Sequence, residues 1–206
     1  MRTDYVTVAG TVEAEIEDRR SRFICRLAPV TDEPAAREVI EQVRADYWDA
    51  RHHCTAFVLD PDSSIRRSND DGEPAGTAGA PILQTLLGSD LTDVVAVVTR
   101  YFGGTLLGAG GLIRAYGAAT RATIERATPR HFRLGRLIMI TTDHATAARL
   151  ESELRDRGDE ITDVSYAELV TLRVVVDSTE DVRSVVAGAS HGTAQIQEIG
   201  TAWRPV

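Results

Sequence analysis

The sequence predicts an α+β protein built from two domains. Its 206 residues are enough for two small hydrophobic cores. The first part mixes strand-like and helix-like patterns and holds one continuous β-branched, apolar run at 94–99. The last part shows the order strand, helix, strand, strand, helix, strand, which is the ferredoxin-like pattern. We therefore place one domain at 1–129 and a second, ferredoxin-like domain at 130–206.

The first elements expected are a hairpin and a helix. Residues 11–30 alternate between polar and apolar side chains on both sides of a polar centre at 18–21. That alternation is typical of two antiparallel strands joined by a tight turn. Thr31 or Asp32 can then cap a helix, and Pro34 fits the first turn of that helix.

A second pair of strands and a short helix follow. Strands are expected at 53–59 and 63–68, with a turn of Asp and Pro between them. A second turn at 69–74 leads to a helix over 78–87. The apolar run at 94–99 is expected to form a strand that is buried on both faces.

A glycine-rich segment connects this buried strand to the next helix, which is expected at 112–127. Arg114 and Arg121 are seven residues apart and fall on the side opposite the apolar face of that helix. Thr128-Pro129 ends the helix and marks the boundary between the domains. In the second domain the expected strands lie at 137–141, 161–166, 169–176 and 194–203, with helices beginning after Asp143 and near Ser178.

Charge is unevenly distributed along the chain. The net charge of −8 argues against a protein that binds nucleic acid over its whole surface. Residues 94–142, however, hold seven arginines and one acid, Glu125, which gives that segment +6 and the rest of the chain −14. All 23 basic residues are arginines, whose planar guanidinium groups can donate paired hydrogen bonds to phosphate or carboxylate. The asymmetry indicates an anionic partner, although acidic neighbours could also account for it.

The segment 103–111 is the strongest indication of a binding site. Five glycines lie between a buried strand and a helix start, where backbone amides can approach an anion. Arg100 enters the segment and Arg114 follows it. The segment lacks the Lys-Ser/Thr of a P-loop and the spacing GxGxxG, so neither of those nucleotide motifs is present. The alternative is a tight turn that allows close packing.

An acidic turn lies nearby. Asp70, Asp71 and Glu73 supply three carboxylates in four residues, which could hold Mg²⁺, act in acid–base chemistry, bind arginines or form a plain polar turn. We favour a structural role and expect at least one of them within ion-pair reach of Arg100 or Arg114.

A metal site is not expected at the histidines. Adjacent residues of a strand point to opposite faces, so His52, His53 and Cys54 cannot all grip one ion. Cys25 is the only other thiol, and both cysteines are expected to be buried and reduced. We expect no metal and no cofactor.

Three segments together resemble the YigZ/IMPACT family in its bacterial, two-domain form: His52–Ala56, Asp70–Leu83 and Val98–Tyr116. The resemblance covers essentially the whole chain. It implies a first domain of the kind found in a ribosomal small-subunit protein, in domain IV of elongation factor G and in the GHMP kinases. It also implies a second domain similar to the ferredoxin-like domain V of that elongation factor.

These observations predict a non-enzymatic, translation-associated regulator that binds RNA or the ribosome. Two alternatives stay open: a protein-interaction module, and a small-molecule phosphate enzyme resembling the GHMP kinases. We assign no catalytic residue. The residues expected to bind the anion are Arg100, Gly103, Gly104, Gly110, Gly111, Arg114 and Arg121, with His52, Asp70, Asp71, Glu73, Thr77 and Tyr101 in supporting roles. A cytoplasmic location without membrane contact is expected, because no long apolar run or secretory signal is found.

Overall fold

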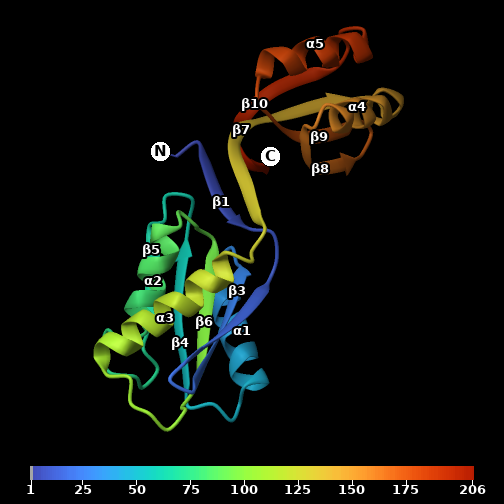
Figure 1. Ribbon diagram of the computed structural model, residues 1–206. Coiled ribbons are helices and arrows are strands. Elements are labelled where there is room, and N and C mark those ends of the chain that lie inside the picture. Colours follow the sequence, from blue (N-terminus) through green and yellow to red (C-terminus); the bar gives the residue numbers. More distant parts are fainter. Residues whose placement is uncertain (1) are drawn as a thin grey trace. The chain divides into compact units, whose positions relative to one another are not determined.

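The computed structural model describes residues 2–206 and confirms the α+β class (Figure 1). The chain divides into two compact units, one ending at His131 and the other spanning Phe132–Val206. Each unit has its own core: the buried clusters of the first lie within residues 8–119, and that of the second lies within 138–186.

The first unit is built on an antiparallel sheet with the strand order β2-β3-β6-β4-β5. Its strands are β2 (Val12–Asp18), β3 (Ser21–Pro29), β4 (His52–Leu59), β5 (Ile65–Asn69) and β6 (Val94–Tyr101). The predicted hairpin is confirmed as β2 and β3, and the pairing of the next two strands as β4 and β5. The apolar run is β6, at the centre of the sheet, and its first six side chains are all buried.

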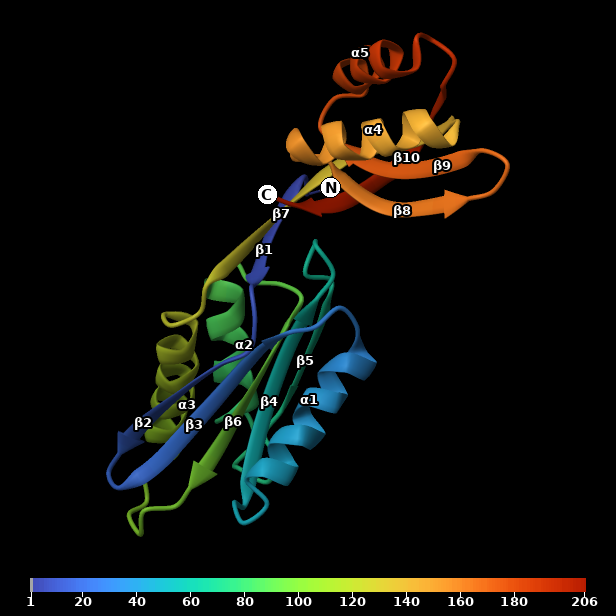
Figure 2. The same ribbon diagram turned by 90° about the vertical axis from the view of Figure 1, so that its right-hand side faces the viewer.

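Helices cover both faces of this sheet. The helix α1 (Glu33–Asp46) packs on one face, and α2 (Gly79–Gly88) and α3 (Ala109–Ile124) pack on the other (Figures 1 and 2). The predicted cap of α1 is confirmed, because the Asp32 carboxylate accepts a hydrogen bond from the Ala35 amide at 2.8 Å. The two helices of the second face bring the glycine-rich segment and the acidic turn to the same end of the sheet.

Three elements differ from the sequence-based expectation. The helix α3 begins at Ala109, three residues before the expected start at 112. Gly108 takes a positive φ of 72°, which turns the chain into the helix at that residue. The strand β1 (Asp4–Val8) was not expected; it pairs with β7 (Pro129–Thr142), which starts eight residues before the predicted 137. The early part of β7 is mostly polar, so it lacks the apolar alternation on which the prediction depended.

The second unit has the ferredoxin-like order. Its elements are β7, α4 (His144–Asp156), β8 (Glu160–Tyr166), β9 (Val170–Val176), α5 (Thr179–Ser190) and β10 (Gln195–Pro205). Its strands lie in the order β10-β7-β9-β8, all antiparallel. The predicted caps are present, with Asp143 accepting from the Thr146 amide and Ser178 from the Asp181 amide.

Candidate functional site

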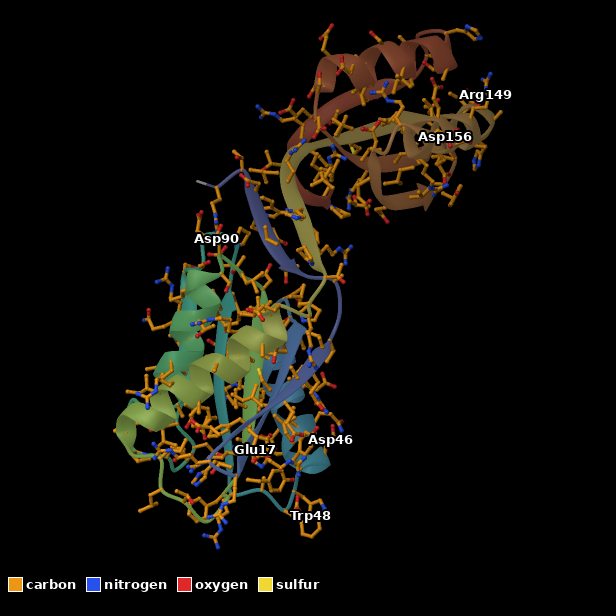
Figure 3. The ribbon with its side chains drawn as sticks, viewed as in Figure 1. Glu17, Asp46, Trp48, Asp90, Arg149 and Asp156 are labelled. Carbon is orange, nitrogen blue, oxygen red and sulfur yellow. The ribbon has the colours of Figure 1, made fainter. Side chains whose placement is uncertain are left out.

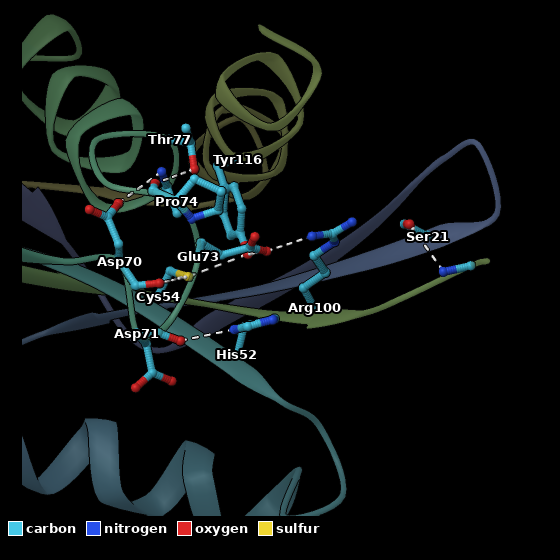
Figure 4. A network of polar contacts seen from close by, with 12 residues as sticks. Ser21, His52, Cys54, Asp70, Asp71, Glu73, Pro74, Thr77, Arg100 and Tyr116 are labelled. Carbon is cyan, nitrogen blue, oxygen red and sulfur yellow. Dashed lines mark hydrogen bonds and ion pairs between the residues drawn. The ribbon is translucent and has the colours of Figure 1, made fainter. Parts of the chain in front are cut away.

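The acidic turn is tied to the protein by hydrogen bonds (Figure 4). The Asp70 carboxylate accepts from the backbone amides of Gly76, Ala78 and Gly79 at 2.8 to 3.0 Å, which fixes the start of α2. Burial opposes ionisation there, but the three amides outweigh it and hold the pKa of Asp70 below its usual range. Asp70 therefore acts as a structural cap.

Asp71 connects the turn to its neighbours. Its carboxylate accepts from Arg44 Nη2 of α1 and from the His53 amide of β4, both at 2.7 Å. Its own carbonyl oxygen lies 2.9 Å from His52 Nδ1. The supporting residue Thr77 lies in the same turn, where its buried hydroxyl donates to the Pro74 carbonyl at 2.6 Å. These contacts hold the turn against the sheet edge rather than pointing it into solvent.

Glu73 forms a buried ion pair with Arg100. The two side chains are almost fully covered, and Arg100 Nη1 donates to Glu73 Oε1 at 2.7 Å. This confirms the expectation that one acidic-turn carboxylate reaches Arg100. It also corrects the assignment of Arg100 as a phosphate ligand, because the residue is 7% exposed and already shares its charge with Glu73.

Two more buried groups complete this network. The Tyr116 hydroxyl donates to Glu73 Oε1 at 2.7 Å, and Cys54 Sγ donates to the Tyr116 oxygen at 3.3 Å. Burial raises the pKa of Cys54 to about 12 and, together with Cys54 and Glu73, also raises the pKa of Tyr116. Both groups therefore stay protonated and act as donors within the buried network around Glu73.

The glycine-rich segment is shaped by close packing as well as by backbone conformation. A Cβ on Gly103 would lie 2.0 Å from the Arg20 carbonyl carbon, and one on Gly111 would lie 2.8 Å from Leu107 Cβ. Gly104 has a φ of 84°, a conformation that favours glycine. Gly110 meets only the end of the Arg114 side chain, at 3.6 Å. Close packing therefore accounts for two of the four glycines assigned to the anion site, Gly103 and Gly111, and backbone conformation accounts for Gly104.

Arg114 and Arg121 lie together on the surface of α3. Both are exposed and both line a groove of about 480 Å³ between α2 and α3, with Ile113 and Gly117 beside them. No carboxylate forms an ion pair with either arginine within residues 2–206. The count of +6 overstates the open positive surface, because Arg100, Arg133 and Arg136 pair with Glu73, Asp177 and Glu198.

The histidines and thiols do not form a cluster that could hold a metal. His53 is buried, with Nδ1 3.1 Å from Thr99 Oγ1, whereas His52 faces the acidic turn. Both cysteines are free and buried. Within residues 2–206 there is no group of three His, Cys, Asp or Glu side chains suited to a metal ion.

Sequence reasoning missed a hollow beside Arg100. Its volume is about 470 Å³, and it lies between the loop after α1 and the end of β6. Tyr101, one of the residues expected in a supporting role, also lines the hollow, and its hydroxyl donates a hydrogen bond to Asp49 at 2.6 Å. Arg51, Phe102 and Leu106 also line the hollow, and Phe102 and Leu106 are exposed. The sequence signal that could have indicated this hollow is a pair of apolar residues, Phe102 and Leu106, beside a polar turn, because exposed apolar side chains often mark a binding site.

Comparison with known proteins identifies the family. Residues 19–124 match the Impact N-terminal domain, which includes the acidic turn, β6, the glycine-rich segment and α3. The chain belongs to the IMPACT family. The IMPACT family member YvyE of Bacillus subtilis is 40% identical over 85% of this chain and 81% of its own length. The IMPACT family member YigZ of Escherichia coli is 36% identical over 93% of this chain and 96% of its own length.

A solved structure extends this agreement to both units. A crystal structure described only as that of a hypothetical protein is 35% identical to this IMPACT family member, with a TM-score of 0.74. It covers 97% of this chain and 98% of its own. In the chain described here, none of the helices within residues 2–206 is long and apolar enough to span a membrane.

Proposed function

We propose that this IMPACT family member is a non-enzymatic, translation-associated protein that binds RNA or the ribosome through the arginines of α3. The observation that carries the proposal is the pair Arg114 and Arg121. Both are exposed on one groove and neither is neutralised by a carboxylate within residues 2–206. Guanidinium groups in such a position suit phosphate oxygens, which present paired acceptors.

The contacts of the acidic turn argue against the phosphate-enzyme alternative. A Mg²⁺ site there would need carboxylate oxygens that can turn toward the cation. Asp70 is held by three amides, Asp71 by Arg44 and Glu73 by Arg100. The protein-interaction alternative is favoured by Ile113, which is 45% exposed in the same groove. The salt dependence of the binding affinity distinguishes an RNA partner from a protein partner.

A salt titration with a single-stranded RNA oligomer tests the proposal. Because phosphate contacts release counterions, the log–log slope of affinity against salt is roughly −0.7 per phosphate neutralised. Arg114→Ala should flatten the slope by about that amount and weaken binding for all RNA sequences alike. The matched control is Arg183→Ala, another exposed helical arginine, on α5, which should leave the slope unchanged.

Two results would contradict the proposal. One is a wild-type protein that neither binds RNA at low salt nor co-sediments with ribosomes in a low-salt gradient. The other is an Arg114→Ala variant that keeps the full slope. A partner that binds through Ile113 would instead give a shallow salt dependence and a large loss of affinity in Ile113→Ser.

A further inference from the structure

The hollow beside Arg100 shares no lining residue with the groove of α3, so the inference drawn from it does not rest on the function proposed above. Its walls come from Asp49, Arg51 and His52 on one side and from Arg100, Phe102 and Leu106 on the other. Its volume of about 470 Å³ is in the range of small-ligand sites. It therefore has room for one compact ligand.

Phe102 offers a supported aromatic surface in this hollow. The residue is 57% exposed. The Arg100 guanidinium carbon lies 5.7 Å from the centroid of its ring and 5.5 Å from the centroid of Phe23, so Arg100 contacts both aromatic rings. Glu73 fixes Arg100 from within (Figure 4). The Phe102 ring therefore has a preorganised support.

The charge in the hollow that lacks an ion pair is that of Arg51, because Arg100 is paired with Glu73. The buried Nε of Arg100 has no hydrogen-bond partner among residues 2–206. Arg51 is exposed at the rim and forms no ion pair within the described residues 2–206. Asp49 already accepts the Tyr101 hydroxyl. A ligand with both a ring and an anionic group satisfies these features together.

We propose that the hollow binds one nucleotide unit, with its base stacked on Phe102 beside Leu106 and its phosphate paired with Arg51. An aromatic face suits any base, because every base has a π-face, and a guanidinium suits the phosphate. The nucleotide can come from a free nucleotide or from an unstacked residue of a single-stranded RNA. Both sources present the same chemistry to the hollow.

The test is a titration of the full chain with ribonucleoside monophosphates, followed by NMR of the backbone amides. Saturable shifts are expected at 49–52 and 100–106. Phe102→Ala should weaken AMP binding about tenfold or more, which is the range for loss of one base–aromatic stack. Arg51→Ala should weaken binding of AMP but not of adenosine. Tyr166→Ala removes an exposed aromatic side chain of the second unit and should change nothing.

The two sources are separated by comparing AMP with an RNA tetranucleotide. Tighter, Phe102-dependent binding of the tetranucleotide identifies RNA, and equal affinities identify a free nucleotide. The proposal is overturned if no monophosphate gives saturable shifts at millimolar concentration, if inorganic phosphate competes as well as AMP, or if Phe102→Ala binds like wild type. Arg114→Ala should leave AMP binding intact, so failure of the α3 proposal is distinguishable.

Discussion

Arg100 is buried, yet it supports Phe102, which is exposed at the surface beside it. It is the last residue but one of the central strand, pairs with Glu73 and contacts the rings of Phe23 and Phe102. A buried charge of this kind costs desolvation energy, which only good geometry and shared hydrogen bonds offset. It contacts the acidic turn on one side and the exposed Phe102 on the other, so it positions both of them.

The buried pair leads to a prediction about stability. Glu73→Gln leaves the Arg100 charge buried without a counter-charge and should lower the free energy of unfolding by about 3–5 kcal/mol. The control is Glu15→Gln, which breaks an exposed pair with Arg22 of similar length, 2.7 Å. That control should cost less than about 1 kcal/mol. Urea denaturation of both variants makes the measurement, and equal small losses would show that Glu73 does not compensate Arg100.

The residues of the site were predictable in kind but not in role. Acids, glycines and arginines between Asp70 and Arg121 indicated a site, and the expected contact between the acidic turn and Arg100 is present. Burial was not predictable, because nothing in the local pattern distinguishes Arg100 from the exposed Arg114. The contributions of Cys54, Tyr116 and Phe102 depend on the meeting of β4, β6 and α3, which are far apart in the sequence.

The elements with strong periodicity were predicted with nearly correct bounds. The hairpin, α1 with its Asp32 cap, the central β6 and the second unit from residue 137 onward follow from apolar spacing and capping residues. The strand β1 and the first half of β7 were missed because their pairing depends on each other rather than on a local pattern. The exposure of Trp48 just after α1 (Figure 3) was not predicted either, because no apolar pattern surrounds that residue.

The glycine-rich segment that leads into α3 gives a prediction at the scale of elements. Gly103→Ala would place a Cβ 2.0 Å from the Arg20 backbone, and the backbone must shift to admit it. We expect a loss of about 1–3 kcal/mol in unfolding free energy. Gly110→Ala lies in the first turn of α3, where the added Cβ would make only an ordinary contact with the end of the Arg114 side chain at 3.6 Å, and should instead stabilise by about 0.4–1 kcal/mol. Thermal unfolding measures both, and similar losses at the two positions would contradict the packing explanation.

At the scale of the whole molecule, the two units are described by separate cores. The buried side chains of the first unit group around the sheet of β6, and those of the second group around β7, β9, α4 and α5. The proposed phosphate site belongs to the first unit, where Arg114 and Arg121 share one groove. In the second unit Arg133 and Arg136 are in ion pairs, whereas Arg183 is exposed and without an ion pair among the described residues, which makes it the control for this proposal.

The domain boundary gives the last prediction. Residues 125–131 between α3 and the second unit are mostly exposed, and two arginines in this stretch, Arg126 and Arg130, are sites for trypsin. If each unit folds on its own core, brief digestion should leave two resistant fragments of about 14 and 8 kDa. Changing both arginines to Gln should protect the chain from that first cut, while Arg183→Gln should not. First cuts inside either unit, or degradation without stable fragments, would show that the two cores depend on each other for stability.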